Sequence, residues 1–293
     1  GGYMGLFKAI ILGIVQGLTE FLPVSSSGHL TICKQLIGME DIGFSFDIIL
    51  HVGTLLAVFL VYWRDIGRLI VDGIGIIVDV CFNIKEFFVS KKMQDEPFYR
   101  KVICNGYRKF AMLVIVSTIP TGIIGYFGKD LVEKAGTTLL VPGICLIITA
   151  TLLLISDNLP DGKKKPKKTS YLNALFIGTC QGIATLPGLS RSGTTITAGL
   201  LCGLKREFAV KYSFIMSIPA IMGAAVLDIA DFGKDGMTSS DLGCYIAGAL
   251  VAAVVGYICI KTMLVIVRNK KFKYFAYYCY LVGAIAVIGY FVK

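Results

Sequence analysis

Two polar segments of similar sequence interrupt this otherwise apolar chain. Residues 16–29 read QGLTEFLPVSSSGH, and residues 181–194 read QGIATLPGLSRSGT, which lies 165 positions later. Such a match at one constant offset indicates an internal repeat. A charge near the middle of a membrane costs roughly 2.5–3.5 kcal/mol on insertion scales, so polar segments at membrane depth are functional candidates. The identical pairs are Ala9 and Ala174, Gly13 and Gly178, Gln16 and Gln181, Gly17 and Gly182, Ser25 and Ser190, Ser27 and Ser192, and Gly28 and Gly193.

The composition places the chain in a membrane. Of the 293 residues, 55% are hydrophobic and 16% are charged, and the mean hydropathy is +0.75. Soluble domains carry about 25% charged residues. The net charge of +10 comes from basic residues in loops beside apolar segments. Orientation and contact with anionic lipid explain this pattern better than nucleic-acid binding. The nine cysteines are scattered without metal-ligand spacing, which is typical of small buried apolar side chains.

The apolar runs on either side of each polar segment are shorter than a membrane crossing, which needs about 20 residues. We therefore expect two re-entrant helix–loop–helix pairs, over residues 6–37 and 171–204. Irregular backbone at membrane depth is tolerated where protein or a water-filled cavity covers it. Six longer runs predict full spans, at residues 44–63, 110–127, 138–155, 208–230, 242–267 and 274–292.

These elements predict an all-α polytopic membrane protein built from two repeats. The first repeat covers residues 4–156, a basic linker follows at 157–170, and the second repeat covers 171–293. Each repeat has one re-entrant pair and three spans. Because three is odd, the second repeat enters the membrane from the opposite face, so the repeats are inverted and their broken helices meet near the midplane.

The distribution of basic residues gives an orientation. Loops 64–109, 156–170, 205–207 and 268–273 fall on one side in this topology and are rich in Lys and Arg. Basic loops stay in the cytoplasm, so both termini are expected outside. Within the first loop, residues 69–89 are moderately apolar and predict a separate interfacial helix.

The first polar segment holds a candidate cation site. Gln16 and Glu20 are four residues apart and share one helix face. A carboxylate beside an amide carbonyl suits a hard divalent cation such as Mg²⁺ or Ca²⁺. The alternative is that Glu20 is simply paired with an internal cationic side chain.

The same segment continues with groups that suit an anion and a proton transfer. Ser25, Ser26, Ser27 and Gly28 offer hydroxyls and backbone N–H groups at a helix start, which is a place where anions bind. His29 opens that helix, close enough in sequence to reach a serine, so we expect it to be catalytic. The sequence leaves His51, inside the first span, open between a structural hydrogen bond and a role in the site.

The second segment supplies a positively charged side chain, which the first segment lacks. Arg191 stands at the repeat position of Ser26, between Ser190 and Ser192 and before Gly193. A planar guanidinium with neighbouring N–H donors is well suited to grip a phosphate. A loop arginine reaching for water is the alternative. A carboxylate, an imidazole, hydroxyls and an arginine at membrane depth point to phosphoryl transfer from a lipid substrate.

These motifs also carry a resemblance. QGLTEFLPVSSSGH resembles the (E/Q)xxxE and PxSSxGH elements of the bacterial undecaprenyl-diphosphate phosphatases, the BacA/UppP family of bacitracin-resistance proteins, and PGLSRSGTT resembles their PGxSRSG element. The spans between the motifs fit as well. The resemblance implies hydrolysis of undecaprenyl diphosphate to undecaprenyl phosphate and inorganic phosphate, with a divalent cation, in the bacterial plasma membrane and with the site open to the outer face.

By the same resemblance, Gln16 and Glu20 serve the metal and the diphosphate. Ser26 and His29 serve the chemical step, and Arg191 holds phosphate. Gln16 carries no charge, so it does not supply a second acidic ligand. The expected substrate-binding residues are Ser25, Ser27, Gly28, Ser190, Ser192, Gly193 and Thr195.

Two questions stay open at this level. Either Ser26 attacks with His29 as general base, or His29 attacks and forms a phosphohistidine; a base–nucleophile pair explains both residues and favours Ser26. The rival class of protein is a transporter or flippase for a prenyl-phosphate lipid, because inverted repeats with broken helices are transporter architecture. The expected partners are the lipid substrate and membrane lipids, with a homodimer left open.

Overall fold

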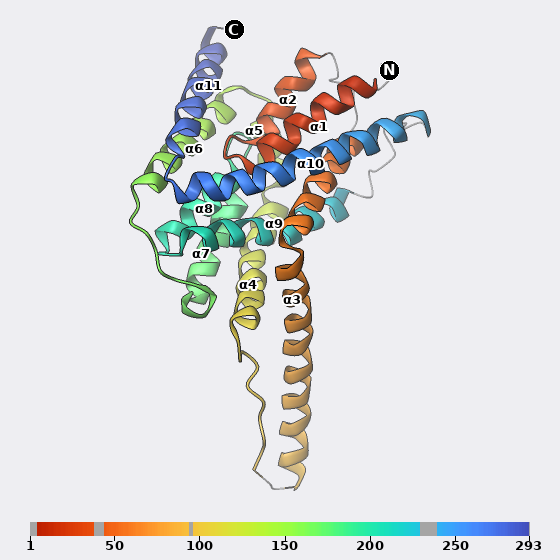
Figure 1. Ribbon diagram of the computed structural model, residues 1–293, viewed down its shortest axis with the longest axis vertical. Helices are drawn as coiled ribbons and strands as arrows, with labels where there is room; N and C mark the ends of the chain where they lie inside the picture. Colours follow the sequence, from red (N-terminus) through yellow and green to blue (C-terminus); the bar gives the residue numbers. More distant parts are fainter. Residues whose placement is uncertain (1–4, 38–43, 94–95, 229–238, 293) are drawn as a thin grey trace.

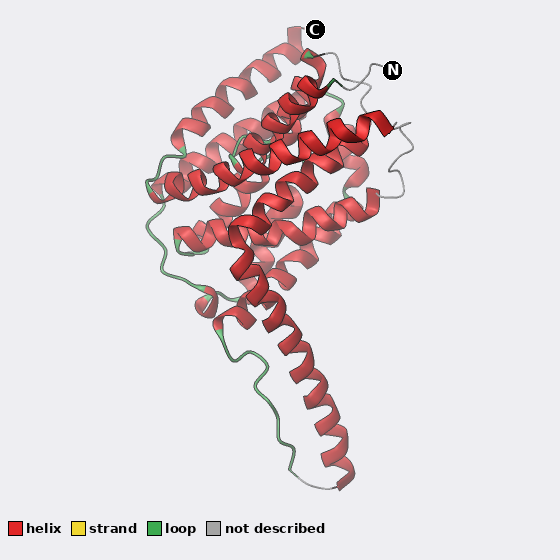
Figure 2. Ribbon diagram, turned by 45° about the vertical axis from the view of Figure 1, so that its right-hand side comes forward, coloured by secondary structure: helices red, strands yellow, loops and turns green. Residues whose placement is uncertain are grey.

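The computed structural model describes residues 5–37, 44–93, 96–228 and 239–292, and within these ranges it is helical without a strand (Figures 1 and 2). The α-helices are α1 (Leu6–Phe21), α2 (Ser26–Leu36), α3 (Phe44–Met93), α4 (Gly106–Phe127), α5 (Lys129–Gly136), α6 (Leu140–Asn158), α7 (Tyr171–Ile183), α8 (Arg191–Leu201), α9 (Arg206–Asp228), α10 (Ser239–Arg268) and α11 (Lys273–Val292), and a short 3₁₀ turn covers Pro166–Lys168.

The predicted class of fold is confirmed. In the described part of the chain six helices are long and apolar enough to cross a membrane, namely α3, α4, α6, α9, α10 and α11. They correspond one by one to the six predicted spans, although residues 229–230 of the fourth lie outside the described ranges. Many of their large apolar side chains are exposed, as lipid-facing side chains must be when the protein is described without its membrane.

Both expected broken pairs are present. The first pair is α1 and α2, separated by residues 22–25, and the second is α7 and α8, separated by residues 184–190. The longest of these four helices, α1, has 16 residues, which is too short for a crossing. The polar residues therefore lie at helix breaks inside the bundle.

The first helix of each half packs against a helix of the other half. Helix α1 packs along α10, and its counterpart α7 packs along α4, while α6 packs along α11 and α3 touches α9. Repeated glycines mark the two matched crossings. A Cβ at Gly13 would collide with the carbonyl oxygen of Gly248 in α10, and one at Gly178 with that of Ser117 in α4. Small residues at these positions let the helix backbones approach closely.

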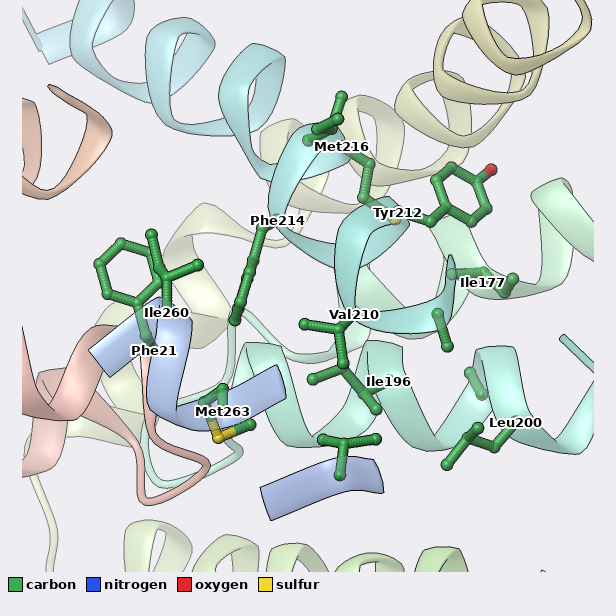
Figure 3. Close-up of a cluster of buried hydrophobic side chains, with 14 of the residues drawn as sticks. Phe21, Ile177, Ile196, Leu200, Val210, Tyr212, Phe214, Met216, Ile260 and Met263 are labelled. Carbon is green, nitrogen blue, oxygen red and sulfur yellow. The ribbon is translucent and has the colours of Figure 1, made fainter. Parts of the chain in front are cut away.

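The main core lies where the helices of both halves meet (Figure 3). Phe21, at the end of α1, makes an edge-to-face contact with Phe214 of α9, with ring centroids 5.3 Å apart. Met216 of α9, Ile260 of α10 and Ile196 of α8 are fully buried in the same cluster. This core fixes the ends of α1 and α8, which carry the polar segments.

One expectation about the chain after the first span is wrong. The predicted span at residues 44–63 is not followed by a loop, because α3 bends at Tyr62 and continues as helix to Met93. Its only non-helical residue is Tyr62, with φ −109° and ψ 21°, where the helix changes direction. Residues 69–89, predicted as a separate helix, are the continuation of this long helix. No Pro or Gly stops the helix at the change of direction, so the bend is absorbed within the turn at Tyr62.

Three of the basic loops meet one another. Arg206 donates to Asp161 at 2.7 Å, and Lys270 lies 3.7 Å from the same carboxylate. The backbone N–H of Lys273 donates to Asp157 at 2.8 Å. These contacts bring the segments around residues 157–161, 206 and 270–273 together.

Candidate active site

A cavity of about 300 Å³ lies between the two helix breaks. Its polar wall comes from the end of α1, from both breaks and from α3, α4 and α7, and α9 supplies an apolar wall. Ser26 of the first break and Arg191 of the second both line this cavity. The lining residues are Thr19, Glu20, Ser25, Ser26, Ser27, Asp47, Ile48, His51, Thr121, Gln181, Ala184, Thr185, Leu189, Ser190, Arg191, Ala220, Ile221, Ala224 and Ala225.

Glu20 is the centre of the polar groups. Its side chain is only 4% exposed. Ser26 Oγ donates to Glu20 Oε2 at 2.7 Å, and Gln16 Nε2 donates to the same oxygen at 3.1 Å. Arg191 donates to the other oxygen, Oε1. The carboxylate thus joins the serine of the first break to the arginine of the second.

The two helix starts at the cavity favour an anion. Helix α2 begins at Ser26 and α8 begins at Arg191, and each has 11 residues. Ser190 caps α8, because its Oγ accepts from the N–H of Gly193 at 3.2 Å. The first N–H groups of a helix and its dipole attract negative charge. Two such helix starts face one cavity, which suits a ligand with more than one negative charge.

Ser25 has an unusual backbone conformation. Its φ is +71°, in the left-handed region that non-glycine residues rarely adopt. The turn allows α2 to start immediately after the break, and it leaves Ser25 Oγ 3.4 Å from Ser27 Oγ. Local strain of this kind is tolerated where surrounding packing fixes it, and it clusters at functional sites.

Comparison with known proteins shows the family of this chain. Residues 9–285 match the family described as bacitracin resistance protein BacA. The chain belongs to the BacA family. It is 41% identical to the undecaprenyl-diphosphatase of Methanosphaera stadtmanae over 285 residues, covering 97% of this chain and 98% of that protein. It is 43% identical to the undecaprenyl-diphosphatase of Alkaliphilus metalliredigens over 286 residues, with the same two coverages. It is 39% identical over 289 residues to that of Desulforapulum autotrophicum, covering 99% of this chain and all of that protein.

In this BacA-family chain His29 does not pair with a serine side chain. Its Nδ1 lies 2.8 Å from the carbonyl oxygen of Ser25, and its Nε2 lies 2.6 Å from the hydroxyl of Tyr278 in α11. The His29 and Tyr278 rings stack with centroids 5.6 Å apart. His29 is absent from the cavity wall. Its catalytic role stays a prediction, but the expected contact with a serine hydroxyl is not formed.

Four other predicted residues lie behind the cavity wall. Thr195 shares a hydrogen bond of 2.6 Å with Ser213 and donates to the carbonyl oxygen of Arg191, so it braces the first turn of α8. Ser192 Oγ lies 3.3 Å from Ser190 Oγ. Gly28 and Gly193 occupy helix starts without lining the cavity. These four residues shape the helix starts.

The sequence left the role of His51 open, and the structure places this residue at the cavity. Its Nε2 lies 3.9 Å from Glu20 Oε2, and its Nδ1 lies 2.8 Å from the carbonyl oxygen of Asp47. A carbonyl only accepts, so Nδ1 carries a proton, and in the neutral ring Nε2 then faces Glu20 with its lone pair. Asp47 also lines the cavity and pairs with Lys34 at 2.7 Å. Sequence analysis missed Asp47, although its spacing of four from His51 on one helix was a usable signal.

The oxygen donors around Glu20 bear on whether a divalent cation can bind there. Among the described residues no group of three His, Cys, Asp or Glu side chains could hold a metal. Gln16 Oε1, however, is buried without a hydrogen-bond partner. Rotating this amide would turn Oε1 toward Glu20, an arrangement that a cation between the two oxygens would stabilise. Mg²⁺ often binds one or two carboxylates together with substrate phosphates, so the site fits a cation shared with a diphosphate.

Proposed function

We propose that this chain is an integral membrane phosphoric anhydride hydrolase that converts undecaprenyl diphosphate to undecaprenyl phosphate and inorganic phosphate. The observation that carries the proposal is the junction of Ser26, Glu20 and Arg191 at one cavity, in a chain about 40% identical to undecaprenyl-diphosphatases over nearly its whole length. Regenerating the lipid carrier supports peptidoglycan and cell-wall synthesis, and thereby resistance to bacitracin.

The cavity accommodates both ends of such a lipid. The diphosphate meets Arg191 and the two helix starts, where a guanidinium and N–H groups offset its charge. The prenyl chain suits the opposite wall, which α9 lines with Ala220, Ile221, Ala224 and Ala225. A polar head and an apolar tail are thus bound by different sides of one cavity.

Ser26 is the nucleophile in the mechanism that we propose. Its hydroxyl is already hydrogen-bonded to Glu20, at 2.7 Å, which places a proton acceptor in reach. Ser26 Oγ bonds to the terminal phosphorus as its proton passes to Glu20. The bond from that phosphorus to the bridging oxygen breaks, and undecaprenyl phosphate leaves with the bond electrons. Water then attacks the phosphorus of the phosphoserine, and the bond from phosphorus to Ser26 Oγ breaks. Glu20 returns its proton to Oγ, and the phosphate leaves with the oxygen and protons of the water.

Arg191 stabilises the charge in both steps. It has five N–H donors, and only part of this set is engaged by Glu20. The free donors bind phosphoryl oxygens while the ion pair keeps the guanidinium in place. His51, with Nε2 3.9 Å from Glu20, is the imidazole nearest to these groups and can take up a proton from Glu20 or from water.

We also propose that Glu20 and Gln16 hold a divalent cation, Mg²⁺ or Ca²⁺, together with the diphosphate. Such a cation offsets the negative charge of the diphosphate when it is bound. The buried and unpartnered Gln16 Oε1 supports this assignment. Gln16 must turn its carbonyl toward Glu20, and Ser26 must keep its hydrogen bond to the carboxylate.

We infer further that the two halves are inverted repeats and that the protein lies in the bacterial plasma membrane with both termini outside. The exchanged packing of α1 on α10 and α7 on α4 supports the first inference. The meeting of three basic loops supports the orientation, because such loops stay in the cytoplasm. The site is then expected to open to the outer face.

The direct test is phosphate release by the purified protein in detergent with undecaprenyl diphosphate and a divalent cation. Release of inorganic phosphate that requires Ser26 is the expected result. Binding of the lipid without release of inorganic phosphate would overturn the hydrolase assignment and favour the transporter alternative. That alternative is not favoured, because a serine that is hydrogen-bonded to a carboxylate and lies beside an arginine is arranged for a chemical reaction rather than for transport.

A further inference from the structure

The long helix α3 continues as an arm beyond the bundle, over residues 64–93 (Figure 1). At 1.5 Å per residue it is roughly 45 Å long. The acidic residues of the arm are Asp65, Asp72, Asp79 and Glu86, which are seven positions apart. Residues seven apart lie on nearly the same side of a helix, so the acids form one stripe.

This acidic stripe is fully used inside the protein. Asp65 accepts from Tyr107 and from Lys211, each at 2.9 Å. Asp72 accepts from Asn105 at 2.7 Å, and Arg108 pairs with both Asp72 and Asp79.

The chain that returns along the arm covers the rest of the stripe. Arg100 donates its N–H to Asn83 at 2.7 Å and places its guanidinium 3.9 Å from the centre of the Phe82 ring. The N–H of Phe98 donates to Glu86 at 3.3 Å. The return segment therefore occupies the polar side of the arm.

The opposite side of the arm is apolar and bare. Val71 is 71% exposed, Ile77 is 64% exposed and Phe88 is 65% exposed. In water this apolar surface would be uncovered. Contiguous apolar surfaces of this size mark contacts with lipid or protein. The exposed apolar side chains are Ile70, Val71, Ile74, Ile77, Val78, Val80, Ile84, Phe87, Phe88, Val89 and Met93.

The width of this face distinguishes lipid from a second helix. Ile70, Ile74, Ile77, Ile84 and Phe88 follow the spacing of a coiled-coil seam. A coiled coil, however, needs a narrow stripe with charged flanks. Here the flanking positions are filled by further apolar residues, which are Val71, Val78, Val80 and Phe87. A face this wide exceeds what one partner helix covers and matches a helix lying in the acyl chains.

The charges on the bare side indicate which lipids it meets. Lys85, Lys91 and Lys92 are exposed, and none has an acidic partner among the described residues. Lysines around an apolar face extend their amines to anionic headgroups. Trp63, the single tryptophan, lies 64% exposed where the span becomes the arm, a position typical of membrane interfaces.

The arm leaves the bundle after Tyr62, and in Figure 1 it runs across the direction of the span α10. We propose that the arm, residues 64–93, lies along the membrane surface on the basic side of the protein, with its apolar face in the acyl chains and Lys85, Lys91 and Lys92 at anionic headgroups.

The test uses tryptophan fluorescence of the full chain in vesicles of phosphatidylcholine and phosphatidylglycerol with brominated acyl chains, which quench tryptophan on contact. In a Trp63→Phe background, Phe88→Trp places the probe on the bare face. Phe82→Trp is the matched control, because Arg100 covers that position. Phe88→Trp is expected to lose most of its emission and Phe82→Trp little. Replacing the three lysines by Gln should remove any gain in Phe88→Trp quenching as phosphatidylglycerol increases.

Three results would overturn the proposal. Equal quenching of both probes would show that the faces are not distinguished, and no quenching of Phe88→Trp would place the arm in water. Cross-linking of Ile77→Cys between copies, with an unquenched Phe88→Trp, would assign the face to a second copy of the chain. Unchanged elution and helical circular dichroism confirm that each variant is folded.

Discussion

Arg191 donates a hydrogen bond to Glu20, although 171 positions separate them in the sequence. The two side chains come from the two halves of the chain and meet at the cavity that also holds Ser26. The pair fixes the guanidinium where a phosphate would bind. It also holds in place the carboxylate that accepts a hydrogen bond from Ser26.

Arg191→Ala should lower phosphatase activity by roughly 10²–10³, the usual effect of losing one donor to developing negative charge. Arg191→Lys should also be poor, because an ammonium cannot bind Glu20 and a phosphate with one planar fork. Phosphate release at saturating substrate measures both variants. A folded Arg191→Lys variant with wild-type activity would contradict the phosphate-binding role.

Glu20→Gln should abolish activity while the protein stays folded. The amide keeps hydrogen-bonding groups toward Ser26 and Arg191, but it neither takes up the serine proton nor supplies charge to a cation. Titrating the divalent cation in the activity assay checks the second role, with thermal unfolding as the folding control. Residual activity with an unchanged cation optimum would show that the cation binds elsewhere or arrives with the diphosphate.

Variants of His29 separate chemistry from positioning. The amide nitrogen of Asn can replace Nδ1 in the hydrogen bond to the Ser25 carbonyl oxygen, whereas Ala cannot. Because both ring nitrogens are engaged by Ser25 and Tyr278, we expect His29→Asn to retain much more kcat than His29→Ala. If both variants are equally inactive and phosphohistidine forms in the wild type, His29 is the nucleophile and Ser26 is not.

The helix crossings should be sensitive to one added carbon. Gly13→Ala and Gly178→Ala each place a Cβ against a backbone carbonyl of the partner helix, so each should destabilise by about 1–3 kcal/mol. Gly122→Ala is the control, since nothing lies within 4 Å of its Cβ position in α4. It should be neutral or stabilising, by up to about 1 kcal/mol. Thermal unfolding in one detergent compares the three variants, and similar melting temperatures would contradict the close packing.

The loop contact at Asp161 should depend on pH. The hydrogen bond from Arg206 holds the pKa of Asp161 below its ordinary value of 3.8, with a smaller effect from Lys270. A carboxyl with a lowered pKa in the folded state stabilises above its ordinary pKa, and this stabilisation is lost as the pH falls through the lowered value. Asp161→Asn should therefore lower the melting temperature at neutral pH. The difference from the wild type should shrink in acid, and a constant difference would show that the charge is not responsible.

The sequence by itself determined the class of fold and most of its elements. Apolar runs of spanning length predict six helices, and shorter runs around QGLTEFLPVSSSGH and QGIATLPGLSRSGT predict the two breaks, because length and hydropathy are local properties. The constant offset of 165 positions also placed Ser26 and Arg191 at one repeat position. These inferences succeed because neighbouring residues decide whether a segment can cross a membrane.

Side-chain partners were decided only by the tertiary structure. His29 lies near three serines in the sequence, but its ring points to Tyr278, which is 249 positions away. His51 joins the cavity because the packing of α3 turns it toward Glu20. The arm continues past residue 63 because Asp65, Asp72 and Asp79 find their partners in the returning chain. Hydropathy and spacing describe one helix at a time, whereas the direction of a side chain depends on how that helix is rotated against its neighbours.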